Sequence, residues 1–495
     1  MQQSPLAAVF SLRRGEARTV ALGGLAFFLI LCSYFVLRPV REAMGVHRDF
    51  GDLYWLWIVT LLGMVAANAL YATLASTIAK RLLATCTYRV FALSIAAFVL
   101  VLTFAPHLAE RPFTTIPFVD QPLTVGHVFY VWLSVFNLFA VSLFWAQSVD
   151  RFSLEQAKRL FPLLGAGGTL GALAGSTITT SLAGHVEPVF LMGLSLVLWR
   201  GAIAASQWAF GSKPDADTRS PARVTPPDSP TAAPSHPSPR TANAGTHTGP
   251  LNSWRALARV VASPYLLGIS AWMFALAIAS SLLYFTQARI ITDTGAGLRD
   301  KIFLFAQIDL LTQGATLLIQ LTIAARLFRV LGVGRMLLVI PALLVLGYAA
   351  LAVAPVYAVL ALFQAAFRAS RYAIATPARE SLFTVVSPEE KYVSKAALDT
   401  FVYRAGDVAG LLIYALLAAT LAAVAGVVVP LAIAWSLVGL WLGRRQRAMA
   451  GDGHPPGHCR SCGYNLAGLP LARCPECGAD SPLIAPPPAS TDART

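Results

Sequence analysis

Twelve long apolar runs, separated by short polar connections, dominate the pattern of hydrophobic and polar positions along the chain. The first run covers residues 19–37, and the others begin near residues 53, 90, 125, 163, 189, 264, 302, 336, 356, 396 and 421. Each is roughly 18 to 25 residues long, which is enough for a helix to cross a bilayer. The first run has no small-residue cleavage motif after it, so we interpret it as a retained helix. The pattern predicts an all-α integral membrane protein of twelve helices.

A polar segment divides the runs into two sets of six. Residues 211–251 are rich in Pro, Ser, Thr and Ala, a composition that cannot bury apolar surface and is typical of a disordered linker. Six helices, a long linker and six more helices is the layout of the major facilitator bundle. We therefore expect an N-terminal half at residues 1–210, a linker at 211–251, a C-terminal half at 252–445 and a tail at 446–495.

The placement of Lys and Arg predicts the orientation. The loops after the second, fourth, eighth and tenth runs are basic, whereas those after the fifth, ninth and eleventh carry no Lys or Arg. We expect the protein in the inner (plasma) membrane of the cell. The positive-inside rule then places the linker, the tail and both termini in the cytoplasm. Several cations lie on the wrong side and need another explanation: Arg38, Arg41, Arg48, Arg289, Arg299 and Lys301.

The composition excludes a soluble fold and several activities. The chain of 495 residues is 56% hydrophobic and 13% charged, with a mean hydropathy of +0.63, against roughly 25% charged residues in a soluble domain. The net charge of +14 does not indicate nucleic-acid binding, because the basic residues lie between apolar runs. The Gly-rich stretch GAGGTLGALAG lies inside an apolar run without the GK[ST] of a phosphate loop. Nothing in the sequence argues for an enzyme.

Ionisable residues inside the predicted spans are functional candidates, because a charge at mid-bilayer costs roughly 2.5 to 3.5 kcal/mol. For Asp309 we weigh a cation or proton site against a structural partner arginine on a neighbouring helix. Arg404 and Asp407 lie three apart on one helix face, either as a self-neutralising pair or in a substrate site. Arg368 and Arg371 lie near the end of the tenth span. They either belong to a functional site or extend their side chains to the membrane interface.

The same sequence pattern, a charged connection followed by a glycine-containing helix, recurs in both halves. Acidic and basic residues precede a helix with small residues four apart, Gly167 and Gly171 in the first half and Gly406 and Gly410 in the second. Small residues at this spacing let helix backbones approach closely. One such motif is as compatible with packing noise as with function, but its recurrence at pseudo-equivalent positions favours a shared architecture.

Three segments resemble the nucleotide exchange transporters, the ATP/ADP translocases of plastids and intracellular bacteria. YFVLRPVREAMGV is similar to the LRDTKD segment of that family, with Arg41 at the lysine position. FWAQSVDRFSLEQAKRLFPLLGAG is similar to its FW, EAKR and PLFG pattern. SRYAIATPARESLFTVVSPEEKYVSKAALDT is similar to its KYSLFDPCKE and KGKAAID pattern. The resemblance covers residues 20–445.

This resemblance implies twelve helices and exchange of ATP for ADP, with basic residues gripping phosphates and acidic residues contributing to coupling. Family acids fall on Gln156 and near Leu283, and several family lysines are arginines, so a divergent branch that moves another phosphorylated anion fits equally well. We expect a monomeric transporter that works by alternating access. Its candidate substrate-binding residues are Arg38, Arg41, Glu155, Lys158, Arg159, Asp309, Arg371, Arg379, Lys395, Asp399, Arg404 and Asp407.

The tail carries a metal-site pattern. Its cysteines form C-x2-C-x11-C-x2-C with a glycine after each pair: Cys459, Cys462, Cys474 and Cys477. Four thiolates at this spacing are typical of a structural Zn²⁺ site with tetrahedral ligands. We predict a zinc ribbon at residues 457–480 with an unidentified cytoplasmic partner, and keep a redox dithiol pair and a disulfide as alternatives.

Two other functions remain open at this point. One is a non-transporting membrane sensor that signals through the zinc ribbon. The other is a facilitator-type exporter of unrelated solutes, which would depend little on Arg41 or Lys395. The charged connections at corresponding positions of both halves favour transport, because a protein that only anchors a domain to the membrane has no need of them.

Overall fold

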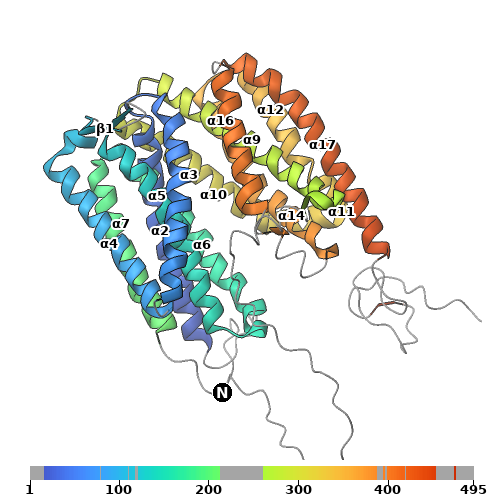
Figure 1. The fold of residues 1–495 in the computed structure, drawn as a ribbon, viewed down its shortest axis with the longest axis horizontal. Helices are drawn as coiled ribbons and strands as arrows, with labels where there is room; N and C mark the ends of the chain where they lie inside the picture. Colours follow the sequence, from blue (N-terminus) through green and yellow to red (C-terminus); the bar gives the residue numbers. More distant parts are fainter. Residues whose placement is uncertain are drawn as a thin grey trace, which may run out of the picture. The chain divides into compact units, whose positions relative to one another are not determined.

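The chain forms helices along almost its whole described length (Figure 1). The computed structural model describes residues 16–77, 80–109, 111–116, 121–211, 260–386, 394–395, 398–417, 420–452 and 473–474. Within these residues, nine helices are long and apolar enough to cross a membrane, or ten if one bent pair counts as a single span. The expected multi-pass helical architecture is therefore confirmed, while the count of twelve is not.

Two compact units make up the described part of the chain. Unit 1 takes its residues from Met1–His247, Leu283–Leu318 and Val353–Ala369. Unit 2 takes its residues from Thr248–Leu282, Ile319–Ala352 and Ser370–Thr495. The helices α9 (Pro264–Asp293) and α10 (Leu298–Thr322) contribute to both units. The division into halves at residues 210 and 252 stays a prediction.

Unit 1 is built around α2, which packs against α5, α6 and α7. Its further elements include a two-stranded antiparallel hairpin in which Thr114 pairs with Leu123. Aromatic rings fill the space between helices, as where Phe27 stacks on Phe144 with ring centroids 4.3 Å apart. The elements are α2 (Glu16–Gly45), α3 (Asp52–Thr77), α4 (Lys80–Phe104), η1 (Pro106–Ala109), β1 (Thr114–Ile116), β2 (Gln121–Leu123), α5 (Val125–Arg151), α6 (Leu154–Leu182), α7 (Pro188–Phe210) and α13 (Tyr357–Ser370).

Unit 2 packs the first part of α9 with the long helix α17 and with several shorter, interrupted helices. Trp272 and Trp435 lie in its core with ring centroids 5.5 Å apart. Its remaining elements are α11 (Ala324–Met336), α12 (Val339–Val353), η3 (Arg371–Ala375), α14 (Thr376–Leu382), η4 (Phe383–Val385), η5 (Leu398–Val402), α16 (Tyr403–Leu416) and α17 (Leu421–Asp452). Of these, η3 and η5 are π-helical turns, which interrupt the regular helices on either side.

Most helices begin where the hydrophobic pattern predicts. The starts of α3, α5, α7, α9, α10, α12, α13 and α17 lie within four residues of the expected positions. The π-helical turns explain the missing spans, because they break the tenth and eleventh expected segments into pieces too short to qualify. The helices α4 and α6 begin ten and nine residues before the expected positions, at Lys80 and Leu154. The helix α2 continues to Gly45 instead of ending at Leu37. Its added turns carry the charged residues described next.

The glycine motifs act as expected inside each unit. A Cβ on Gly171 would collide with the backbone of Phe28, so α6 and α2 approach at this point as closely as glycine allows. A Cβ on Gly410 would lie 2.6 Å from the Ser281 Cβ and 3.0 Å from the Ile278 carbonyl oxygen. The predicted close approach is therefore confirmed for α6 on α2 and for α16 on α9.

Candidate functional site

Five charged side chains from three helices converge inside unit 1. Arg38, Arg41 and Glu42 lie in the last turns of α2, Asp309 lies in the middle of α10, and Arg368 lies near the end of α13. We call these five residues the charge cluster. The two carboxylates are almost inaccessible, with side chains 5% exposed at Glu42 and 4% exposed at Asp309.

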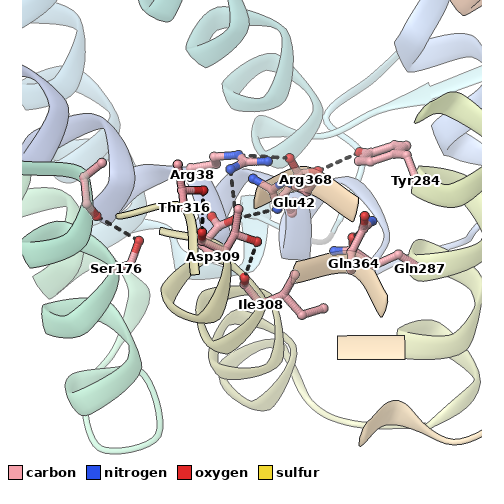
Figure 2. Close-up of polar contacts among 12 residues, drawn as sticks. Arg38, Glu42, Ser176, Tyr284, Gln287, Ile308, Asp309, Thr316, Gln364 and Arg368 are labelled. Carbon is pink, nitrogen blue, oxygen red and sulfur yellow. Dashed lines mark hydrogen bonds and ion pairs between the residues drawn. The ribbon is translucent and has the colours of Figure 1, made fainter. Parts of the chain in front are cut away.

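Asp309 joins the three helices of the charge cluster. Arg38 Nη1 and Arg368 Nη1 each donate to Asp309 Oδ1 at 2.8 Å, as Figure 2 shows. One structural arginine partner was the alternative considered for Asp309, and the structure provides two. Arg368 is buried in this pair, so its side chain does not snorkel. Breaking such a pair leaves a buried charge uncompensated, which makes the contact costly to remove.

The charge cluster has an excess of positive charge. Three guanidinium groups face two carboxylates, because Glu42 pairs with Arg41 and lies 3.9 Å from Arg38 Nε. Two N–H groups, at Arg368 Nη2 and Arg41 Nε, are buried without a hydrogen-bond partner in the described part of the chain. Buried donors are normally satisfied. The arrangement therefore has the charge and the free donors to receive an anion.

Polar and aromatic side chains surround the charge cluster. Arg41 donates to Ser134 Oγ at 3.0 Å and lies over the ring of Tyr130, 4.8 Å from its centroid. The Tyr284 hydroxyl donates to Glu42 Oε2 at 2.6 Å and lies 2.8 Å from the Tyr130 hydroxyl. A Cβ on Gly45 would lie 2.6 Å from the Tyr130 ring, so glycine here lets the ring lie against α2.

Two buried amides lie in the same region of unit 1. Gln364 Nε2 donates to Gln287 Oε1, and both side chains are nearly inaccessible. Figure 2 shows this pair near Arg368 and Tyr284. The polar region therefore extends beyond charged residues to groups that can donate and accept hydrogen bonds.

Unit 2 holds a separate arginine with neutral partners. Arg371 donates to Tyr403 Oη at 2.5 Å and to Ser280 Oγ at 3.1 Å. It has no ion pair with a carboxylate in the described residues. The expected pair of Arg404 and Asp407 is confirmed, with Nη1 and Oδ2 3.0 Å apart.

Three further candidates form a partly exposed network with Glu380 in unit 2. Lys395 Nζ lies 2.6 Å from Glu380 Oε2, and Arg379 bonds both Glu380 and Asp399. Burial alone would raise the pKa of the Glu380 carboxyl, but the hydrogen bonds from Lys395 and Arg379 outweigh it and hold that pKa below its usual range. Lys395 is therefore already neutralised by a neighbour.

The remaining candidates are placed only in part. Arg159 pairs with Glu16 at 3.1 Å, which ties the start of α6 to the start of α2. Gln156 completes the capping box of α6 with Ser153 and also donates to Glu16. The side chains of Glu155 and Lys158 lie outside what the structure describes.

The cysteine pattern falls mainly on undescribed residues. Cys459, Cys462 and Cys477 lie outside the described part, whereas Cys474 is buried. Within the described residues no group of three or more His, Cys, Asp or Glu side chains could hold a metal ion. The zinc ribbon stays a prediction.

The cations that broke the charge rule after the seventh run have local partners in unit 1. Lys301 is buried and its Nζ lies 3.4 Å from the carbonyl oxygen of Val46, just past the end of α2. Arg299 pairs with Glu187, and Arg289 pairs with Asp293 at 3.1 Å. These contacts account for the three residues without a role in orientation.

Sequence reasoning missed several polar residues of the charge cluster and its surroundings. The first apolar run ends at Leu37, so the hydrophobic pattern places Glu42 outside the predicted span, whereas α2 includes it. Its position beside Arg41 was a usable signal for a longer helix. Adjacent acidic and basic side chains can neutralise each other, and a membrane helix can then continue past them. Tyr130, Tyr284 and Gln364 gave no signal, because single polar residues are common in apolar helices.

Comparison with known proteins finds likeness at the level of structure alone. No protein-family model matches the chain, and no curated protein matches it. A mutant of the nucleoside transporter NupG aligns with a TM-score of 0.55 and 13% identity, over 87% of this chain and 99% of that one. An auto-inhibited peptide transporter of the POT family aligns with a TM-score of 0.53 and 16% identity, over 87% of this chain and 97% of that one. The chain is similar to these proteins in fold.

Proposed function

We propose that the protein is a secondary transporter that carries an anionic, phosphorylated solute across the membrane by alternating access. The observation that carries this proposal is the charge cluster, in which three guanidinium groups, one buried and two part-buried, face two buried carboxylates. An unbalanced cation within membrane-spanning helices is expensive, and such residues mark substrate or ion pathways. A structural role for Asp309 requires one arginine and does not explain the third.

The chemistry of the charge cluster favours a phosphate group. Guanidinium groups present planar, bidentate donors that match phosphate and carboxylate oxygens. The unpartnered donors at Arg368 Nη2 and Arg41 Nε add two bonds that an anion would complete. Arg371, with hydroxyl partners, is a second cation that an anion could neutralise.

The finer identity of the solute rests on the resemblance to the nucleotide exchange transporters. The matching residues Arg41, Arg371 and Lys395 favour a nucleotide and an exchange of one solute for another. The NupG protein is named as a nucleoside transporter, and a nucleotide differs from a nucleoside by its phosphate. Fold likeness by itself does not transfer a substrate, so the charge cluster supplies the argument for the phosphate. A transporter of this kind acts as a monomer and is not an enzyme.

Uptake into proteoliposomes tests the proposal. Vesicles with purified protein are preloaded with unlabelled counter-substrate and given labelled inorganic phosphate, glucose 6-phosphate, ATP, a neutral nucleoside or a cation. We expect the wild type to take up at least one phosphorylated anion. Loss of a charge-assisted bond is worth about 1.5 to 3 kcal/mol, so Arg41→Ala and Arg368→Ala should reduce apparent affinity by about tenfold or more.

Matched variants separate a binding defect from a folding defect. Arg289→Ala removes an exposed arginine with an exposed partner and should leave uptake unchanged. Lys395→Ala tests the candidate in unit 2 that the family resemblance indicates. A wild type that moves only neutral or cationic solutes contradicts the proposal, as does normal anion uptake by both cluster variants.

We also propose that the tail binds one structural Zn²⁺ through Cys459, Cys462, Cys474 and Cys477. The donor set fits this metal, because four thiolates fill a tetrahedral site and leave no position for a substrate. Elemental analysis of the purified, reduced full chain should give one zinc per molecule. Cys459→Ser should lower that content, and an unchanged content would contradict the site.

A further inference from the structure

A stripe of exposed apolar side chains on α17 ends in arginines. These apolar positions recur every four residues and so share one face of the helix: Val429, Ile433, Leu437 and Trp441. The next residues on that face, Arg444 and Arg445, are also exposed. On a helix long enough to cross a membrane, an exposed apolar stripe faces the lipid tails, and a tryptophan followed by arginines marks the level of the headgroups. The end of α17 therefore enters the headgroup layer.

The short helix α11 also presents an arginine among exposed apolar residues. Ile323, directly before α11, and Val330 within it are exposed, and the exposed Arg326 lies between them. These positions are three and four residues apart, so they share a face. With 13 residues, α11 cannot cross the hydrocarbon core of a bilayer by itself. A face of this kind suits a helix that lies at the level of the headgroups.

The helices α11 and α17 touch at a pair of glycines. Figure 1 shows α11 beside α17, and the two pack together within unit 2. A Cβ on Gly334 would lie 3.1 Å from the Gly443 Cα, and a Cβ on Gly443 would collide with the Gly334 Cα. Gly332, with a φ of +66°, adopts the left-handed conformation that favours glycine and lets α11 bend just before this contact. The two backbones are thus as close as glycine allows.

This contact brings arginines of both helices together. Arg335 and Arg444 directly follow the two glycines, and both are exposed. Consecutive Cα atoms are about 3.8 Å apart, so the Cα atoms of these two arginines lie no more than about 12 Å from each other. Arg447 Nε donates to the Gly443 carbonyl oxygen at 3.2 Å, which turns this side chain back toward the contact. We call Arg335, Arg444 and Arg447 the crossing arginines.

The crossing arginines lack acidic partners within the part of unit 2 that the structure describes. The ion pairs there are those of Arg379, Lys395 and Arg404, and none includes a crossing arginine. Arg326 and Arg445 add two more exposed positive charges on the same two helices. The positive-inside rule asks only for positive charge in a connection, not for arginines of two helices at one contact. The convergence therefore needs an explanation other than orientation.

We propose that the crossing arginines bind the phosphate group of an anionic membrane phospholipid. Guanidinium groups match phosphate oxygens with planar, bidentate donors. The exposed apolar stripe that precedes the arginines on α17 lies where the acyl chains of the same lipid would run. A soluble phosphate gains only the first of these contacts, so a lipid is the ligand that uses the whole surface. The site belongs to unit 2 and does not depend on the solute proposed above.

Native mass spectrometry of the full chain measures this binding. Protein purified in detergent and freed of lipid is titrated with phosphatidylglycerol or with phosphatidylcholine of the same acyl chains. We expect the wild type to prefer phosphatidylglycerol, and the preference to fall as salt is added, because salt screens exposed charges. Each arginine near an anionic lipid surface changes binding by about fivefold, so Arg335→Gln combined with Arg444→Gln should weaken phosphatidylglycerol binding by more than about tenfold.

Matched variants separate a site from an effect of net charge. Arg111→Gln combined with Arg289→Gln removes the same charge from exposed positions of unit 1 and should keep the wild-type preference. Arg335→Lys combined with Arg444→Lys keeps the charge and should bind phosphatidylglycerol more tightly than the corresponding double glutamine variant. Thermal unfolding in phosphatidylcholine should give one midpoint for all of them. If the double glutamine variant does not fold, Arg444→Gln alone decides, with an expected loss of about fivefold.

Competition with soluble phosphates identifies the source of the phosphate group. Millimolar glycerol 3-phosphate or inorganic phosphate should leave phosphatidylglycerol bound to the wild type. If either displaces it, a soluble phosphate is the ligand and the assignment to a lipid is wrong. Equal binding of the two lipids by the wild type also overturns the proposal, as does an equal loss in the variants of unit 1 and of the crossing arginines.

Discussion

Arg41 in unit 1 and Arg371 in unit 2 have the same kind of neutral neighbours and differ in their charged ones. Each donates to a serine hydroxyl and lies near a tyrosine ring, at 4.8 Å from the Tyr130 centroid and 5.4 Å from the Tyr403 centroid. Arg41 is also paired with Glu42, whereas Arg371 has hydroxyl partners in the described residues. The difference teaches that the arginine of unit 1 is held by a paired charge, whereas the arginine of unit 2 is held by neutral hydroxyl groups.

Removal of the acid at the centre of unit 1 should have the largest effect. Asp309→Asn leaves Arg38 and Arg368 without a carboxylate partner in a buried site, which costs about 3 to 5 kcal/mol. We expect an apparent melting temperature in detergent that is lower by about 5 °C. Asp293→Asn, which breaks an exposed pair, is the control and should change it little. Equal shifts in the two variants would refute the structural role of Asp309.

The feature that both units share should give the next largest effect. Gly171→Ala and Gly410→Ala each place a methyl group against a neighbouring helix backbone, and overpacking of this kind costs about 1 to 3 kcal/mol. Thermal unfolding should show similar losses in both. Gly193→Ala has open space around its Cβ position and should be neutral or slightly stabilising. A neutral result at Gly171 would contradict the close approach of α6 and α2.

An effect of similar size is expected where unit 2 relies on hydroxyls. Tyr403→Phe keeps the ring near Arg371 and removes the hydrogen bond at 2.5 Å. A hydrogen bond to a charged group contributes about 1.5 to 3 kcal/mol, so the free energy of unfolding should fall by that amount. Tyr130→Phe should cost less, because the Tyr130 hydroxyl bonds the neutral Tyr284 hydroxyl and Arg41 keeps both the ring and its pair with Glu42. The reverse order in unfolding measurements would break the comparison.

The smallest effect is a pH dependence of unit 2. The pKa of Glu380 is held low by Lys395 and Arg379, so its ionised form contributes stability that is present above its ordinary pKa of about 4.3. That contribution is lost as the pH falls through the lower pKa of the folded state. Melting temperatures of wild type and Glu380→Gln should therefore differ above about pH 5 and converge below it. A difference that widens on acidification would contradict this.

The sequence predicted the helices far better than the charge cluster. Starts near residues 125, 264 and 421 are marked by abrupt changes in hydropathy, which depend on nearby residues only. The end of α2 was missed because Arg38, Arg41 and Glu42 look like a loop until their partners are known. Arg38 and Asp309 are 271 positions apart, and no local pattern reveals such a pair. The need of Asp309 for an arginine was predictable from its burial, but the identity of that arginine was not.

The π-helical turn at Arg371–Ala375 changes which way the following residues point. In an uninterrupted α-helix, residues 11 apart are only about 20° from the same face, so Arg368 and Arg379 would point in one direction. One additional residue in a turn shifts the angular register by about 100°. Arg368 accordingly pairs with Asp309 in unit 1, and Arg379 pairs with Asp399 in unit 2. Deleting one residue from this turn would return both arginines to one face of a continuous helix, about 16 Å apart along its axis, and take at least one of them away from its present partner.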